Sequence, residues 1–135
     1  MEWRQNNYLA SDDKALLGIS EIVALLNELY HTEDYSSEKV QKIVNNSFCV
    51  GLYSDGKLVG FVRIITDKIT LSWIKDFIIE KDHRRKGLGS FIMNCLLAHP
   101  DLSETDIVLG AQDARDFYKK FGFDYENFMT RDAQS

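Results

Sequence analysis

Apolar residues recur along the chain at two spacings, and the spacing changes several times between the two ends. Over residues 14–30 they fall three and four positions apart, which predicts a helix. Residues 37–46 repeat this spacing and predict a second, shorter helix. Before both, residues 3–9 predict a first strand from their aromatic and apolar content. The chain therefore opens with one strand and two helices.

Two β-rich runs flank an Asp-Gly pair in the middle of the chain. The runs cover residues 48–53 and 58–65, and Asp55 and Gly56 stand between them. This arrangement predicts a β-hairpin, because the tightest hairpin turns need positive φ at both central residues. Residues 69–79 supply another strand.

The remaining third of the chain alternates between helix and strand. Residues 87–99 predict a helix that Pro100 stops, and residues 106–109 predict a short strand. A helix over 113–121 ends at Gly122, and a last strand is expected over 123–129. The order β-α-α-β-β-β-α-β-α-β predicts an α/β (α+β) fold with a mixed sheet.

Length and charge restrict the organisation of the chain and its partners. The 135 residues predict a single domain over 1–135, since no repeat or low-complexity linker divides them. The formal net charge is −5. This mild acidity argues against a protein that coats nucleic acid, which would carry a strongly basic domain. It favours cationic partners instead.

The cysteines and the first residues bear on the compartment. Cys49 and Cys95 stand among apolar neighbours, and the first residues contain no apolar run like that of a signal peptide. No stretch approaches the length of a membrane span. We therefore expect a cytoplasmic protein with reduced thiols and no membrane contact. The three histidines and two cysteines show no metal-ligand spacing, so no metal is expected.

The most informative segment is residues 78–90, where a β-rich run ends, a basic loop follows and a helix begins. Backbone N–H groups at the start of a helix lack intrahelical partners and lie at the positive end of its dipole, which suits phosphate. Gly87 would let an anion approach the backbone, and Gly89 would reduce crowding at the helix start. Three cations, Arg84, Arg85 and Lys86, stand beside them in an otherwise acidic chain. These features together predict a polyphosphate ligand at this loop.

Three phosphate-binding motifs were compared with this loop. The dinucleotide fingerprint G-x-G-x-x-G fails, because Ile92 stands where its third glycine would be. The P-loop pattern G-x-x-x-x-G-K-[ST] is absent. The pattern R-x-x-G-x-G matches at Arg84, Gly87 and Gly89. A tight turn capped by basic surface residues is the structural alternative.

A second block, residues 111–123, contains Tyr118 followed by Gly122 and Phe123. Together the two blocks resemble the Gcn5-related N-acetyltransferase (GNAT) superfamily, and nearly the whole chain resembles its small, single-domain bacterial members. The resemblance implies a mixed, mostly antiparallel twisted sheet flanked by about four helices. It also implies transfer of an acetyl group from acetyl-CoA to a primary amine, in a ternary complex without a covalent enzyme intermediate.

The resemblance also implies roles for particular residues. Backbone N–H groups of the loop would hold the coenzyme pyrophosphate, and one from the preceding strand end would face the thioester oxygen. Tyr118 would act as general acid toward the departing thiolate; its structural alternative is a core position on an amphipathic helix. The residues expected to bind acetyl-CoA are Phe77, Ile78, Ile79, Arg84, Arg85, Lys86, Gly87, Leu88, Gly89 and Ser90.

The acceptor side of the reaction is less constrained by motif. Asp76 is the first candidate for the base that removes the amine proton, and the alternative is a structural carboxylate paired within the sheet. Tyr30, His31 and Asp67 are expected to bind the acceptor, a small amine, an amino acid or a peptide amine. We also expect a homodimer and no nucleic-acid partner. Two rivals stay open: a non-catalytic acyl-CoA sensor or regulatory module, and a coenzyme-independent phosphate-binding or protein-interaction domain.

Overall fold

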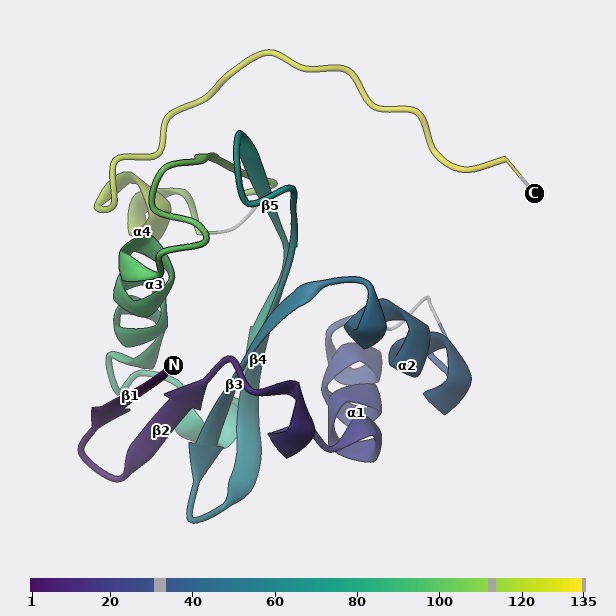
Figure 1. Cartoon of the computed structure of the whole chain (residues 1–135), viewed down its shortest axis with the longest axis vertical. Coiled ribbons are helices and arrows are strands. Elements are labelled where there is room, and N and C mark those ends of the chain that lie inside the picture. The colour runs from purple at the N-terminus through teal and green to yellow at the C-terminus, as the bar shows by residue number, and fades with distance from the viewer. Residues whose placement is uncertain (31–33, 112–113, 135) are drawn as a thin grey trace.

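The computed structural model describes residues 1–30, 34–111 and 114–134, and its centre is one twisted sheet of six strands (Figure 1). The strands lie in the order of the sequence. All neighbours are antiparallel except the last two, which are parallel. The mixed, mostly antiparallel sheet is therefore confirmed. The strands are β1 (Glu2–Gln5), β2 (Tyr8–Ser11), β3 (Phe48–Ser54), β4 (Lys57–Thr66), β5 (Leu71–Ile79) and β6 (Asp106–Leu109).

The prediction of one strand over residues 3–9 was wrong, because the chain turns back in its middle. Asn6 adopts a positive φ of 53°, which asparagine tolerates better than most residues, and β1 pairs antiparallel with β2 across this turn. The central hairpin is confirmed. Asp55 and Gly56 have φ of 51° and 78°, and they join β3 to β4 as the Asp-Gly pair predicts.

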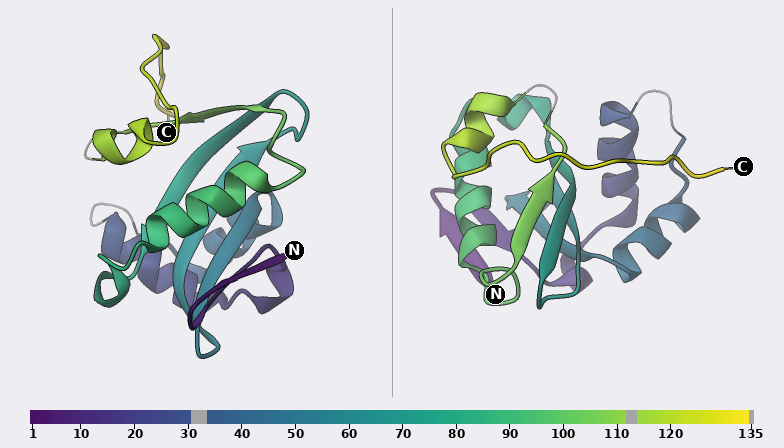
Figure 2. Two further views of the ribbon diagram at one scale, coloured as in Figure 1. Left: turned by 90° about the vertical axis from the view of Figure 1, so that its left-hand side faces the viewer. Right: turned by 90° about the horizontal axis from the view of Figure 1, so that it is seen from above.

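Helices cover both faces of the sheet (Figure 2). On one face lie α1 (Ile19–Leu29) and α2 (Ser37–Asn45), and on the other lie α3 (Leu88–Ala98) and the short α4 (Arg115–Lys119). The four α-helices found in the described residues agree with the number expected. In the described ranges, none of the helices combines the length and apolarity needed to cross a bilayer.

The first helix is shorter than its apolar spacing predicts. Residues Lys14–Leu16 form only a 3-10 turn, and Gly18 caps the start of α1 in an extended conformation. Glycine loses more conformational freedom in a helix than other residues, so the continuous apolar pattern is interrupted here. The three fully buried side chains of α1 all lie beyond this break, and they are Ile22, Leu25 and Leu26.

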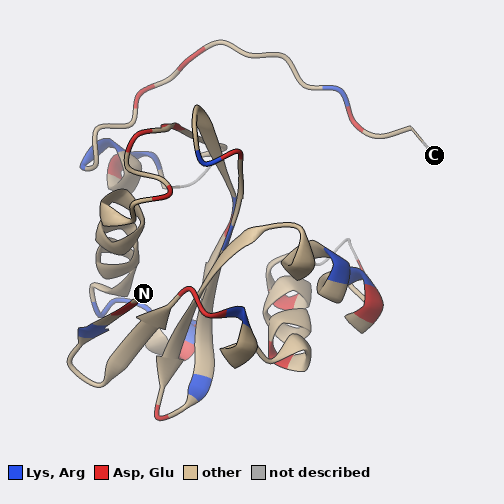
Figure 3. Cartoon of the chain, viewed as in Figure 1, with Lys and Arg blue, Asp and Glu red and all other residues tan. Residues whose placement is uncertain are grey.

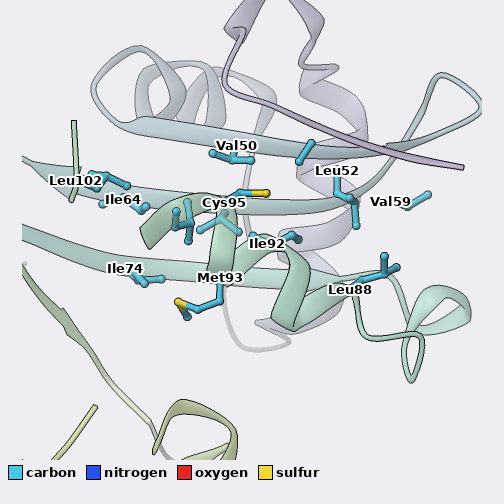
Figure 4. Packing of buried hydrophobic residues seen from close by; sticks show 13 residues of the cluster. Val50, Leu52, Val59, Ile64, Ile74, Leu88, Ile92, Met93, Cys95 and Leu102 are labelled. Atoms are coloured by element: carbon cyan, nitrogen blue, oxygen red, sulfur yellow. The ribbon is translucent and has the colours of Figure 1, made fainter. Parts of the chain in front are cut away.

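The larger apolar cluster surrounds α3 (Figure 4). Ile92, Met93 and Leu96 are at most 1% exposed and pack against inward side chains of β3, β4 and β5. No charged residue occurs in α3, and Figure 3 shows the whole helix without a charged position. Because α3 packs against the sheet, its first turn is held in place where the loop from β5 ends.

The predicted last strand over 123–129 does not form. After α4 and Gly122, whose φ is 89°, the chain has no regular structure and runs away from the sheet as an extended segment (Figure 1). Its large side chains are exposed: Tyr125 by 57%, Phe128 by 54% and Met129 by 98%. Strand-forming residues alone do not make a strand, because pairing and burial against neighbours supply most of its stability.

Candidate active site

The last two strands diverge, and this opens the sheet. β6 pairs with β5 only from Leu71 opposite Asp106 to Ile74 opposite Leu109. β5 then continues to Ile79, while β6 ends at Leu109. The second half of β5 therefore has a partner on its β4 side only, among the described residues.

Backbone groups of β5 face this opening. The N–H of Glu80 donates to the carbonyl of Val59 on the β4 side at 2.8 Å. Successive residues of a strand turn their backbone groups to alternate sides, so Ile79 and Phe77 turn theirs toward the opening. The side chain of Arg84 supports this, since its Nε donates to the carbonyl of Ile79 at 2.8 Å.

A cavity of about 640 Å³ occupies the opening. Its only charged lining residues among those described are Lys75 and Arg84, both cations, so it favours an anionic ligand. Its walls come from the end of α1, the second half of β5, the segment after β6 and α4. The lining residues are Leu29, Tyr30, Ile74, Lys75, Phe77, Ile78, Ile79, Arg84, Leu109, Gly110, Ala111, Ala114 and Tyr118.

The basic loop lies next to this cavity and leads into α3. Arg85 and Gly87 both have positive φ, 64° and 75°, so the loop coils tightly before the helix begins. Gly87 caps α3 through its backbone alone, and no heavy atom lies within 4 Å of where its Cβ would be. The first N–H groups of α3, those of Leu88, Gly89 and Ser90, have no hydrogen-bond acceptor among the described residues, and the exposed side chains of Arg85 and Lys86 belong to the same loop. An anion fits here.

Two other residues of the predicted loop site have structural tasks. The side chain of Leu88 is 2% exposed and belongs to the core around α3, so only its backbone is available to a ligand. A Cβ on Gly89 would lie 3.2 Å from Cζ of Phe117. The missing side chain thus lets the Phe117 ring of α4 pack on the start of α3.

Tyr118 reaches the cavity because its neighbour Phe117 holds α4 in place. The rings of Phe117 and Tyr118 lie 5.1 Å apart, and Phe117 also contacts Phe77 of β5 at 6.3 Å. The Tyr118 hydroxyl makes no hydrogen bond to any described residue. Burial raises the pKa of Tyr118, so the phenol stays protonated at neutral pH. It can donate that proton to a ligand in the cavity.

Asp76 lies behind the cavity wall rather than in it. Its side chain is 4% exposed, and Arg63 Nε donates to Oδ2 at 2.6 Å. The Tyr30 hydroxyl donates to Oδ1 at 2.6 Å and lies 3.4 Å from the carbonyl of Lys75. Both carboxylate oxygens are thus occupied, which favours the structural alternative for this residue.

A β-bulge places the Asp76 side chain on the face of the sheet that α1 covers. Arg63 pairs with Asp76, but the next residue Ile64 pairs with Ile74, so Lys75 has no partner on β4. Ile64 and Ile74 belong to the cluster around α3, whereas Asp76 meets Tyr30 at the end of α1. The extra residue Lys75 shifts the alternation of side chains, so that Ile74 faces α3 while Asp76 faces α1.

The structure brings six of the fifteen predicted site residues together around the cavity. Phe77, Ile78, Ile79, Arg84, Tyr30 and Tyr118 all line the cavity. Arg63 was missed, although a lone arginine within an apolar strand was a detectable signal for a buried charge pair. His31 lies outside the described residues.

Asp67 lies away from the cavity, in the turn between β4 and β5 and at the opposite end of β5 from Ile79. Its carboxylate accepts the N–H groups of Ile69, Thr70 and Leu71 and the Thr70 hydroxyl. These hydrogen bonds, led by that of Thr70, hold the pKa of Asp67 far below its usual range. Asp67 therefore shapes this turn and delays the start of β5 to Leu71, two residues later than predicted.

Comparison with known proteins points to one family. The model of the acetyltransferase (GNAT) domain matches residues 45–125. A candidate acetyltransferase from Gibberella zeae is 27% identical over 114 residues, which cover 70% of this chain and 64% of that relative. The chain thus spans slightly less than two-thirds of the length of this curated relative.

Solved structures share the fold over nearly the whole chain. A candidate GNAT-family acetyltransferase from Xanthomonas campestris pv. campestris is 28% identical, with a TM-score of 0.84 and 93% of each chain covered. A candidate acetyltransferase from Deinococcus radiodurans R1 is 20% identical, with a TM-score of 0.79, covering 98% of this chain and 93% of that one. The second likeness shows the fold alone.

Proposed function

Because the chain belongs to the GNAT family of acetyltransferases, we propose that it transfers an acetyl group from acetyl-CoA to a primary amine. The acceptor would be a small amine, an amino acid or a peptide amine. One observation carries the proposal: the cavity between the diverging strands is bordered by unpaired backbone of β5, by the loop before α3 and by Tyr118.

The donor would bind along β5 and at the start of α3. The N–H groups of Leu88, Gly89 and Ser90 would hold the pyrophosphate, since each charge-assisted hydrogen bond contributes about 1.5–3 kcal/mol. Arg85 and Lys86 are exposed and would add attraction that weakens with salt. Arg84 is held by the carbonyl of Ile79 and would shape the channel toward the thioester.

The thioester end would lie beside Phe77 and Ile79. A backbone N–H of this unpaired edge would donate to the thioester oxygen as negative charge develops on it, a contribution of about 3–4 kcal/mol. The nitrogen of the acceptor forms the new C–N bond, and the C–S bond breaks. The leaving thiolate takes the phenolic proton of Tyr118, while the nitrogen loses one proton to solvent, from which Tyr118 is reprotonated.

The main rival is a non-catalytic module that senses acyl-CoA. Tyr118 favours the enzyme, because its half-buried hydroxyl has no hydrogen-bond partner among the described residues and a raised pKa. If Tyr118 served only to pack the core, its hydroxyl would contribute nothing to the stability of the fold. In a phosphate-binding domain that does not use the coenzyme, the unpaired backbone groups of β5 would have no ligand to bind. Cytoplasmic location and formation of a homodimer stay predictions.

The proposal is tested by amine-dependent release of CoA thiol from acetyl-CoA. The acceptors would be n-butylamine, β-alanine, putrescine and a lysine-containing peptide, with n-butanol as the control without an amino group. We expect at least one amine, and not the alcohol, to raise thiol release at least tenfold above the rate without acceptor. Tight binding of acetyl-CoA with no release for any amine would favour the sensor instead.

A further inference from the structure

The end of α1 supplies a polar group to the cavity whose hydrogen bonding has a fixed direction. Tyr30 lines the cavity and donates its single phenolic proton to Asp76 Oδ1 at 2.6 Å. The carbonyl of Lys75, at 3.4 Å, is the more distant acceptor. A hydroxyl that has donated its proton can only accept further hydrogen bonds. The oxygen that Tyr30 presents to a ligand is therefore an acceptor.

Arg63 makes this direction permanent. Its Nε donates to Asp76 Oδ2 at 2.6 Å, and the arginine and aspartate side chains are only 15% and 4% exposed. Both oxygens of this carboxylate are therefore acceptors, Oδ2 for Arg63 and Oδ1 for Tyr30. Burial, and after it the hydrogen bond to Asp76, raise the pKa of Tyr30, so the phenol keeps its proton. The donor of this pair is always Tyr30.

We propose that Tyr30 positions the acceptor amine by accepting a hydrogen bond from its N–H, with Asp76 and Arg63 as positioning residues behind it. This inference rests on the proposed function and identifies how that site selects its substrate. An amino group retains an N–H to donate while its lone pair attacks the thioester. The site therefore prefers primary amines to hydroxyl compounds, since an alcohol has one hydrogen and loses it on attack.

This role differs from that of a general base. Both carboxylate oxygens of Asp76 already accept a hydrogen bond, one from Tyr30 and one from Arg63. Asp76 also does not line the cavity. The acceptor amine would lose its proton to solvent, and the contribution of Tyr30 would be the orientation of the nitrogen.

The test measures kcat/KM for n-butylamine in three variants, together with acetyl-CoA binding and thermal unfolding. Tyr30→Phe removes the acceptor oxygen. Asp76→Asn reverses the hydrogen bond, because Arg63 forces the amide oxygen toward its Nε and leaves the amide N–H₂ facing Tyr30. The control is Tyr53→Phe, whose buried hydroxyl has no hydrogen-bond partner among the described residues and lies in the cluster beneath α1.

We expect Tyr30→Phe and Asp76→Asn each to lower kcat/KM for the amine about 10- to 100-fold, the loss of one strong hydrogen bond. The double variant should lose no more than either single one. Acetyl-CoA affinity and the midpoint of the pH profile should not change, and Tyr53→Phe should match the unmodified chain. If either variant alone destabilises the fold, the other still tests the proposal.

Three results would overturn the inference: Tyr30→Phe within twofold of the unmodified chain, strictly additive losses, or a shifted pH midpoint, which would make Tyr30 a proton relay. If the unmodified chain acetylates no amine, the proposed function fails, and this inference fails with it. Activity of the unmodified protein toward amines therefore distinguishes failure of the proposed function from failure of this inference alone.

Discussion

Tyr118→Phe is expected to lower kcat about 10²- to 10⁴-fold, the usual contribution of a positioned general acid. The substitution removes one hydroxyl, which makes no hydrogen bond within the described part of the chain. The ring contacts of Tyr118 with Phe117 and Phe123 stay available to phenylalanine. The fold and the donor site should therefore be preserved while the thiolate loses its proton source.

This expectation is measured by kcat with the best amine, alongside the acetyl-CoA dissociation constant from calorimetry. Tyr53→Phe serves as the matched control, because it also removes one hydroxyl that has no hydrogen-bond partner in the described ranges. An unchanged dissociation constant with a lower kcat would identify Tyr118 as a group that acts in the transition state. Turnover within threefold of the unmodified chain would assign Tyr118 to the apolar core instead.

Gly87→Val is expected to weaken acetyl-CoA binding at least about 100-fold. Valine is strained at a φ of 75°, so the backbone of the loop must move, and its side chain enters the space that an anion would occupy. Loss of two charge-assisted hydrogen bonds costs at least about 3 kcal/mol, which corresponds to this factor. Calorimetric titration with acetyl-CoA measures it.

Gly56→Val is the control for backbone strain. Gly56 has nearly the same φ, 78°, and also has no atom within 4 Å of its Cβ position, but it lies in the β3–β4 turn. Both variants should lose about 1–2 kcal/mol of unfolding free energy. Only Gly87→Val should lose affinity for acetyl-CoA. Equal affinities in the two variants would exclude the loop from the donor site.

Local sequence signals were sufficient for much of the fold and for the loop that precedes α3. The hairpin turn at Asp55 and Gly56 was predictable because its backbone needs positive φ. The loop before α3 was predictable because Gly87 precedes an apolar helix. These features depend on a few adjacent residues. The prediction of a strand over 123–129 was wrong because a strand depends on a partner that local pattern does not specify.

Tyr30 and Asp76 were named from the sequence, but their contact with each other and with Arg63 could not be predicted in the same way. Arg63, Asp76 and Tyr30 meet only because of sheet register and one extra residue, Lys75, in β5. Neither the register nor the bulge follows from alternation of apolar residues. The contacts of Asp67 are local instead, since its carboxylate accepts hydrogen bonds from backbone N–H groups of its own turn.

The central claim is that the cavity between β5 and β6, with the loop before α3, binds acetyl-CoA. Thermal unfolding of the unmodified chain with acetyl-CoA, NAD or ATP tests it most directly. Acetyl-CoA at about 100 times its dissociation constant should stabilise the fold by ~2.7 kcal/mol, a rise in Tm of about 10 °C. NAD and ATP should give no comparable shift. No shift with millimolar acetyl-CoA would contradict the account and leave residues 84–90 as a basic turn.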